Sequence, residues 1–149
     1  MQWEKINVCV QKWMKQARKI ILEGRTKELC VEEKTSRCDL VTNVDKFIEK
    51  FYVDRIRETF PNSKILGEEG EADKDLDNFK GLLWIIDPID GTMNFVKQHD
   101  HFASMIAVCE NGIEKLGYIL DVTEDELYWG GPECGVFCND QKVAPPKNL

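Results

Sequence analysis

The sequence has no apolar run long enough to cross a lipid bilayer, and acidic residues outnumber basic ones. A membrane-spanning helix needs about 20 consecutive apolar residues, and no such stretch occurs among the 149 residues. The first residues also lack the basic and then apolar pattern of a signal peptide, so we expect a cytoplasmic protein with no membrane partner. Lys and Arg number 20 against 27 Asp and Glu, a net charge of −7. This surface would repel nucleic acid, and a small phosphorylated substrate would have to be bound through a cation.

Histidine is also scarce, which limits the metals that the chain can bind. The two histidines are His99 and His101, and we expect them to be surface or packing residues. Cys134 and Cys138 are spaced like half of a zinc site, but no second pair of ligands follows. We therefore predict that the six cysteines are reduced thiols without zinc.

The first half of the sequence has the periodicity of two amphipathic helices. The chain has the usual length of one domain, and we assign residues 1–149 to a single domain. Apolar residues recur at intervals of three and four up to Gly24, and again between Thr42 and Pro61. They are Trp3, Ile6, Val10, Trp13, Ala17, Ile20 and Ile21 in the first segment, and Val44, Phe47, Ile48, Phe51, Ile56 and Phe60 in the second. Thr42 and Asp45 have the spacing of a helix-capping box, and residues 32–37 are predicted to be a loop.

The second half of the sequence has the pattern of strands. Residues 82–86 (LLWII) are a compact apolar run, as expected of a strand buried on both faces. Residues 102–109 and 113–120 flank Asn111-Gly112, a strong signal for a hairpin with a type I′ turn. Shorter strands are predicted at 63–66 and 126–129, and residues 143–149 have the composition of a linker. The fold class is therefore α+β, with two N-terminal helices followed by a mostly antiparallel sheet.

The residues with the clearest chemistry follow the apolar strand, in the segment DPIDGT at 87–92. Pro88 stiffens the backbone between two aspartates. The Asp87 carboxylate, the Ile89 carbonyl and the Asp90 carboxylate can then face one point. Oxygen ligands of these kinds suit Mg²⁺, so the segment predicts a magnesium site.

A phosphate site is predicted directly beside these oxygens. Gly91 lets the backbone approach a ligand closely, and a helix that begins at Thr92 would offer free N–H groups to a phosphate. Adjacent metal and phosphate sites are what metal-assisted phosphoester hydrolysis needs. Asp45, Glu68 and Glu69 are further acidic candidates.

Each of these residues also has an ordinary structural interpretation. An Asp-Pro followed by Asp-Gly is a common turn sequence. Asp45 and Thr92, taken alone, would more often be helix caps, and Glu68 and Glu69 would more often be solvated loop charges. The acidic run at 69–77 is predicted to be a solvated, mobile loop.

Three segments resemble motifs of the inositol monophosphatase family, in the family's order and at similar spacing. They are residues 39–45 (DLVTNVD), 67–69 (GEE) and 84–95 (WIIDPIDGTMNF). The resemblance extends over essentially the whole chain and is closer to bacterial than to animal members. It implies a magnesium-dependent, lithium-sensitive phosphatase with the layered α/β sandwich of sugar phosphatases, commonly a homodimer.

The resemblance also implies a role for each matched residue. Glu68, Asp87, the Ile89 carbonyl and Asp90 match metal ligands, and Glu68 also counts among the catalytic residues.

Thr92 and its acidic partner Asp45 match the pair that orients and activates the attacking water. Gly91 and Thr92 match backbone donors to the phosphate, and Asp90 lies beside the substrate.

Part of the family pattern is absent from the sequence. Family members are longer and contain a downstream Trp-Asp motif, whose aspartate completes the second metal site. Asp121, Asp125 and Asp140 lack that context. The chain therefore resembles the N-terminal portion of the family fold without its C-terminal layers, and we expect exposed apolar surface and association.

Three hypotheses about function follow. The first is hydrolysis of a phosphate monoester, with inositol monophosphate as the default substrate and a 3′-phosphonucleotide, a sugar bisphosphate or NADP as alternatives. The second is a haloacid-dehalogenase-type phosphatase, whose nucleophilic and acid–base aspartates lie two residues apart. Asp87 and Asp90 lie three apart, which favours shared metal ligation. The third is a non-catalytic fragment that binds a metal or a partner.

Overall fold

The computed structural model describes residues 2–24, 31–33, 40–68, 79–98 and 100–144. The chain forms three helices and nine strands within these residues. In chain order they are α1 (Gln2–Gly24), β1 (Val31–Glu33), β2 (Leu40–Thr42), α2 (Asn43–Thr59), β3 (Lys64–Leu66), β4 (Leu82–Asp90), α3 (Thr92–Gln98), β5 (Ala103–Glu110), β6 (Ile113–Asp121), β7 (Glu126–Gly131), β8 (Gly135–Cys138) and β9 (Gln141–Lys142). None of the described helices is long and apolar enough to cross a membrane.

One seven-stranded sheet organises the fold, in the order β3-β4-β5-β6-β7-β8-β9. Only β3 and β4 are parallel, and every other neighbouring pair in this sheet is antiparallel. The predicted hairpin joins β5 to β6 through Asn111 and Gly112, whose φ angles of 52° and 81° are both positive, as a type I′ turn requires. The predicted α+β class with a mostly antiparallel sheet is confirmed.

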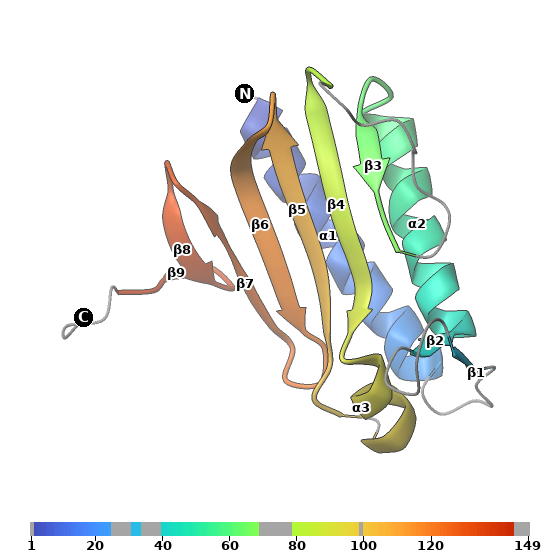
Figure 1. The fold of residues 1–149 in the computed structure, drawn as a ribbon. Helices are drawn as coiled ribbons and strands as arrows, with labels where there is room; N and C mark the ends of the chain where they lie inside the picture. The colour runs from blue at the N-terminus through green and yellow to red at the C-terminus, as the bar shows by residue number, and fades with distance from the viewer. Residues whose placement is uncertain (1, 25–30, 34–39, 69–78, 99, 145–149) are drawn as a thin grey trace.

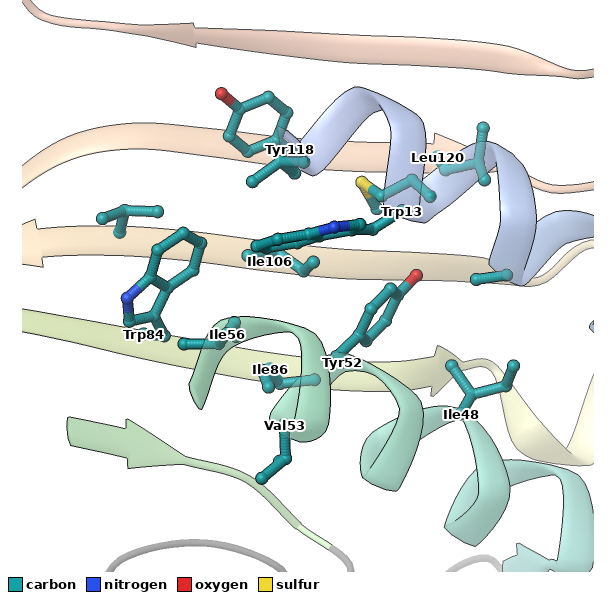
Figure 2. Close-up of a cluster of buried hydrophobic side chains, with 14 of the residues drawn as sticks. Trp13, Ile48, Tyr52, Val53, Ile56, Trp84, Ile86, Ile106, Tyr118 and Leu120 are labelled. Carbon is teal, nitrogen blue, oxygen red and sulfur yellow. The ribbon is translucent and has the colours of Figure 1, made fainter. Parts of the chain in front are cut away.

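Both long helices cover the same face of this sheet (Figure 1). The core between helices and sheet is rich in aromatic rings, and the Trp84 ring centroid lies 6.0 Å from that of Trp13 and 5.4 Å from that of Phe60. The Tyr52 hydroxyl, fully buried, lies 2.7 Å from the Ser104 hydroxyl. Figure 2 shows how α1, α2 and the central strands each contribute large side chains to this cluster. Burial of these side chains holds β4 firmly, which matters because the candidate site lies at its end.

The two predicted helices of the first half are present, but strands β1 and β2 between them were not predicted. Glu32 and Glu33, predicted to lie in a loop, belong to β1, which pairs with β2 through Val31 opposite Thr42. Phe47, predicted to lie on the apolar face of α2, is 58% exposed. The buried stripe of α2 runs at four-residue intervals through Asp45, Glu49 and Val53 with its neighbours, and Phe47 lies outside this stripe. Strands β8 and β9 were not predicted.

Strand β4 is buried on one face only, which corrects the prediction of burial on both. Trp84 and Ile86 point toward the helices and are almost fully buried, whereas Ile85 is 38% exposed. No described element covers the face opposite α1 and α2 (Figure 1). The exposed apolar residues lining a shallow hollow there include Ile85, Ile119, Tyr128 and Val136. Exposed apolar surface is therefore confirmed.

We expect this uncovered face to cause association of the chain in solution. The substitution Ile119→Glu places a charge on it and should weaken self-association by more than about tenfold, because a charge buried in an apolar contact is costly. The matched control is Val8→Glu, on the opposite side of the fold, where Val8 is 69% exposed on α1. Sedimentation velocity across a concentration series measures the effect. Equal association of both variants, or a monomeric wild type, would contradict this expectation.

Candidate active site

The end of β4 contains a bulge that brings two aspartates to one face of the sheet. Asp87 pairs with Met105 and Asp90 pairs with Ala103, so the four residues 87–90 of β4 lie opposite the three residues 103–105 of β5. In a regular strand, residues three apart face opposite sides. The extra residue cancels this difference and turns Asp90 to the same side as Asp87. Asp87 is half-buried and Asp90 is exposed.

Because β3 and β4 are parallel, the Glu68 segment leaves β3 at the same end of the sheet as the end of β4. Leu66 lies opposite Ile85 at the end of the pairing, so Glu68 and Asp87 each follow it by two residues. The Glu68 side chain is exposed. Glu68, Asp87 and Asp90 thus lie at the carboxyl ends of β3 and β4. Among the described residues, no three acidic, His or Cys side chains are grouped closely enough to bind a metal ion as they stand.

The chemistry of these oxygen atoms fits Mg²⁺. Carboxylates from Glu68, Asp87 and Asp90, with the Ile89 carbonyl, form a set of oxygen donors only, which is the type that Mg²⁺ prefers. The Ile89 side chain is buried toward the core. The Ile89 carbonyl, in contrast, is directed out of the core, because its oxygen lies 3.0 Å from the partly exposed Thr92 hydroxyl.

Asp45 and Thr92, predicted to be partners, are in contact. The Thr92 hydroxyl lies 3.0 Å from the Asp45 Oδ1 atom and 3.0 Å from the Ile89 carbonyl oxygen. A hydroxyl has one proton, so it donates to one of these acceptors at a time. Its lone pairs stay available to a further donor, such as a water molecule.

The other oxygen of Asp45 caps helix α2. Asp45 Oδ2 accepts hydrogen bonds from the Thr42 backbone N–H at 3.0 Å and from the Thr42 hydroxyl, while the Asp45 N–H donates to Thr42 Oγ1 at 3.1 Å. This confirms the predicted capping box. Asp45 is 1% exposed, and burial raises the pKa of its carboxyl above 3.8 despite the hydrogen bonds from Thr42 and Thr92, which lower it.

The raised pKa of Asp45 predicts a pH dependence of stability. The unfolded chain loses the Asp45 proton near pH 3.8 and the folded chain at a higher pH. The contribution of this group to the free energy of unfolding is therefore fully present below pH 3.8 and is lost as the pH rises through the folded pKa, at no more than about 1.4 kcal/mol per pH unit. As the pH rises through this range, the free energy of unfolding of the wild type should therefore fall relative to that of Asp45→Asn. Urea unfolding of both proteins between pH 3 and 7 measures it, and a change of the opposite sign would show that the pKa is lowered.

Gly91 makes the turn from β4 into α3 possible. Its φ angle is 85°, a conformation that other residues rarely adopt, and an added Cβ would lie 3.1 Å from the His101 carbonyl oxygen. Helix α3 begins at Thr92, which meets the condition set for the predicted phosphate site, and is held by the Phe95 ring, whose centroid lies 4.9 Å from that of Phe102. The backbone of Gly91 is thus exposed beside Asp90 at the same end of β4.

One buried acidic residue of this region was not predicted. Glu49 is 0% exposed, and its Oε1 atom accepts a hydrogen bond from the Glu68 backbone N–H at 2.5 Å. The signal that could have revealed it is a charged residue one helical turn after Asp45, in line with the buried stripe of α2. Glu49 was missed because only apolar residues were used to trace that stripe.

Some predictions fall outside the described residues or concern residues away from this site. Glu69, His99, Cys30, Cys38 and the acidic run at 69–77 lie outside the described residues. The His101 side chain is 74% exposed, in agreement with a surface residue. Cys9, Cys109, Cys134 and Cys138 are free thiols, and the described residues contain no zinc-type cluster.

Known proteins match the chain along nearly its full length. A family model described as "Inositol monophosphatase family" matches residues 2–148. The inositol-1-monophosphatase of Bacillus subtilis (strain 168) is 48% identical over 145 residues, which are 97% of this chain and 54% of that protein.

Solved structures agree with this match. An IMPase/NADP phosphatase complexed with Mg²⁺ and phosphate has a TM-score of 0.88 and 34% identity, and the match covers 100% of this chain and 56% of that one. A Staphylococcal inositol monophosphatase-1 in an inhibitory complex soaked with LiCl has a TM-score of 0.90 and 34% identity, over 98% of this chain and 55% of that one. The chain spans about half the length of these relatives. By sequence and by fold, the chain belongs to the inositol monophosphatase family.

Proposed function

We propose that these residues carry out the magnesium-dependent hydrolysis of a small phosphate monoester, with inositol monophosphate as the first candidate substrate. The observation that carries the proposal is the contact between the Thr92 hydroxyl and the buried Asp45 carboxylate, directly beside the bulged Asp87–Asp90 segment. The relatives support the choice of substrate class, because they include an inositol-1-monophosphatase and an IMPase/NADP phosphatase solved with Mg²⁺ and phosphate.

Each residue has a role in this proposal. Glu68, Asp87, the Ile89 carbonyl and Asp90 would hold magnesium. The ion would stabilise the negative charge that develops on the transferred phosphoryl group. The exposed backbone at Gly91 lies where it can approach a phosphate oxygen closely, and Asp90 lies beside it.

The Asp45–Thr92 pair is proposed to orient the attacking water. A water molecule that donates a hydrogen bond to Thr92 Oγ1 is directed by a hydroxyl whose own proton points to Asp45 Oδ1, 3.0 Å away. The two hydrogen bonds that Thr42 donates to Asp45 Oδ2 fix the carboxylate, so the hydroxyl has a defined direction. Proton transfer through a positioned group of this kind contributes roughly 100- to 10,000-fold to a rate.

Phosphate release from inositol 1-phosphate and a panel of phosphate esters, including NADP and a sugar bisphosphate, tests the proposal. The chain is assayed with and without Mg²⁺, and with Li⁺ added. The same assay is repeated after mixing with a separately expressed C-terminal segment of the Bacillus subtilis relative, because the chain matches 54% of that protein. Magnesium-dependent release that Li⁺ suppresses, in either preparation, is the expected result. Absence of release in both would contradict a catalytic role and favour a non-catalytic metal-binding chain.

A further inference from the structure

Glu49 is a carboxylate with no exposed surface, and its position calls for an explanation. It lies on α2 one turn after Asp45, on the buried side of the helix, with its carboxylate against Gly67 just after β3. Removing a carboxylate from water is costly unless hydrogen bonds compensate. The Glu68 backbone N–H, 19 residues away in the sequence, donates a hydrogen bond to Glu49 Oε1 at 2.5 Å. A bond of this kind to a charged acceptor is stronger than one between neutral groups.

Gly67 provides the space for this contact. A Cβ atom added to Gly67 would lie 2.7 Å from Cδ of Glu49 and closer still to Oε1. Such a separation is far inside van der Waals contact, so a side chain at position 67 would displace the Glu49 carboxylate. The pair of a glycine and a buried carboxylate therefore joins α2 to the segment that leaves β3.

The sheet alone does not set the direction of Glu68. Strand β3 has three residues, and its pairing with β4 ends at Leu66 opposite Ile85. Glu68 lies two residues beyond that pairing, with an exposed side chain and a backbone N–H bonded to Glu49. The hydrogen bond to Glu49 restrains the Glu68 backbone where the strand no longer does.

We infer that Glu49 is a positioning residue that directs the Glu68 carboxylate toward Asp87 and Asp90. The inference rests on the proposed role of Glu68 as a magnesium ligand. Groups that orient metal ligands typically change metal affinity or activity by about 10- to 100-fold when they are replaced. Glu49 acts through the Glu68 backbone and does not itself bind the ion.

Two substitutions of Glu49 test the inference in this chain. Glu49→Gln keeps an oxygen acceptor of similar shape, and Glu49→Leu removes the acceptor but fills the space. Glu58→Gln, on the exposed side of α2, is the matched control, because the Glu58 side chain is 68% exposed. Two quantities are measured, namely the hydrogen-exchange rate of the Glu68 amide by NMR and the dissociation constant for Mn²⁺ as a probe of the divalent site. Asp87→Asn identifies Mn²⁺ binding that belongs to this site.

We expect the Glu68 amide to exchange slowest and Mn²⁺ to bind most tightly in the wild type, followed by Glu49→Gln and then Glu49→Leu. Glu49→Leu should speed exchange of the Glu68 amide by more than about tenfold and weaken Mn²⁺ binding by about 10- to 100-fold. Glu49→Gln should lie between, and Glu58→Gln should match the wild type. Amides of α1 should keep their wild-type exchange rates in every variant, which separates a local effect from loss of the fold.

The outcomes separate this inference from the proposed function. Faster exchange at Glu68 with unchanged Mn²⁺ affinity would overturn the positioning role, and so would an unchanged Glu68 exchange rate. A wild-type chain that binds no Mn²⁺ sensitive to Asp87→Asn would overturn the proposed metal site, and this inference with it. Gly67→Ala is a second variant with the native Glu49, and it should reproduce the Glu49→Leu result because the added methyl group displaces the carboxylate.

Discussion

The substitution Asp87→Asn is expected to reduce magnesium-dependent phosphate release by roughly 100- to 1,000-fold, in whichever preparation releases phosphate. Asn keeps the size of the side chain but removes the negative charge that a divalent cation requires. Asp87 lies where the bulge in β4 begins, on the same face as Asp90. In the proposed function it shares a cation with the Asp90 carboxylate and the Ile89 carbonyl. The rate at saturating Mg²⁺ and the Mn²⁺ dissociation constant should both change.

The control for this experiment is Asp54→Asn, which removes the same charge from an exposed position on α2. The Asp54 side chain is 51% exposed and pairs with Lys50 at 3.2 Å, away from the end of β4. Near-normal turnover of Asp87→Asn would rule out metal ligation by this residue. A covalent phospho-aspartate trapped on Asp87 would instead support the haloacid-dehalogenase type of mechanism, in which the first aspartate is a nucleophile.

Replacing Thr92 by Val is expected to lower kcat by about 100-fold or more while leaving Mn²⁺ affinity near the wild-type value. Val has the shape of Thr without the hydroxyl, so the bond to Asp45 Oδ1 and the acceptor for the attacking water are both lost. The metal ligands proposed here do not include the Thr92 side chain. A fall in kcat without a change in metal binding therefore reports on water orientation rather than on metal loading.

Thr92→Ser restores a hydroxyl and is the matched control for Thr92→Val. It should recover most of kcat, because the serine Oγ can reach Asp45 from the same position at the start of α3. Equal loss in the Ser and Val variants would show that the Thr92 methyl group or the turn matters, and not the hydroxyl. An unchanged kcat in Thr92→Val would exclude the proposed role of the pair.

The fold was largely predictable because its strongest signals are local. Two amphipathic helices, a capping box at Thr42 and an Asn-Gly turn at 111–112 are set by residues within a few positions of one another. Long-range packing decides what was missed. Only tertiary structure shows that the outer face of β4 at Ile85 is uncovered and that Phe47 lies outside the buried stripe. Strands β8 and β9 are short and partly exposed, so their sequence has little apolar alternation.

The candidate site was predicted unevenly for a similar reason. Asp87, Asp90, Gly91 and Thr92 are close together in the sequence, and the motif that they form was recognisable. The contact between Asp45 and Thr92 spans 47 positions and was inferred only through the family resemblance. Glu49 has no motif of its own, and its function depends on a distant backbone N–H, which a single sequence does not reveal.

Asp45 contributes both to the folding of the chain and to the proposed turnover at the candidate site. One of its oxygens starts helix α2 and the other contacts the hydroxyl at the candidate site. A substitution at position 45 is therefore under selection for folding and for turnover at the same time, and a variant that keeps one of these properties will often lose the other. Libraries built to raise thermal tolerance should therefore hold position 45 constant and vary the exposed positions of the same helix.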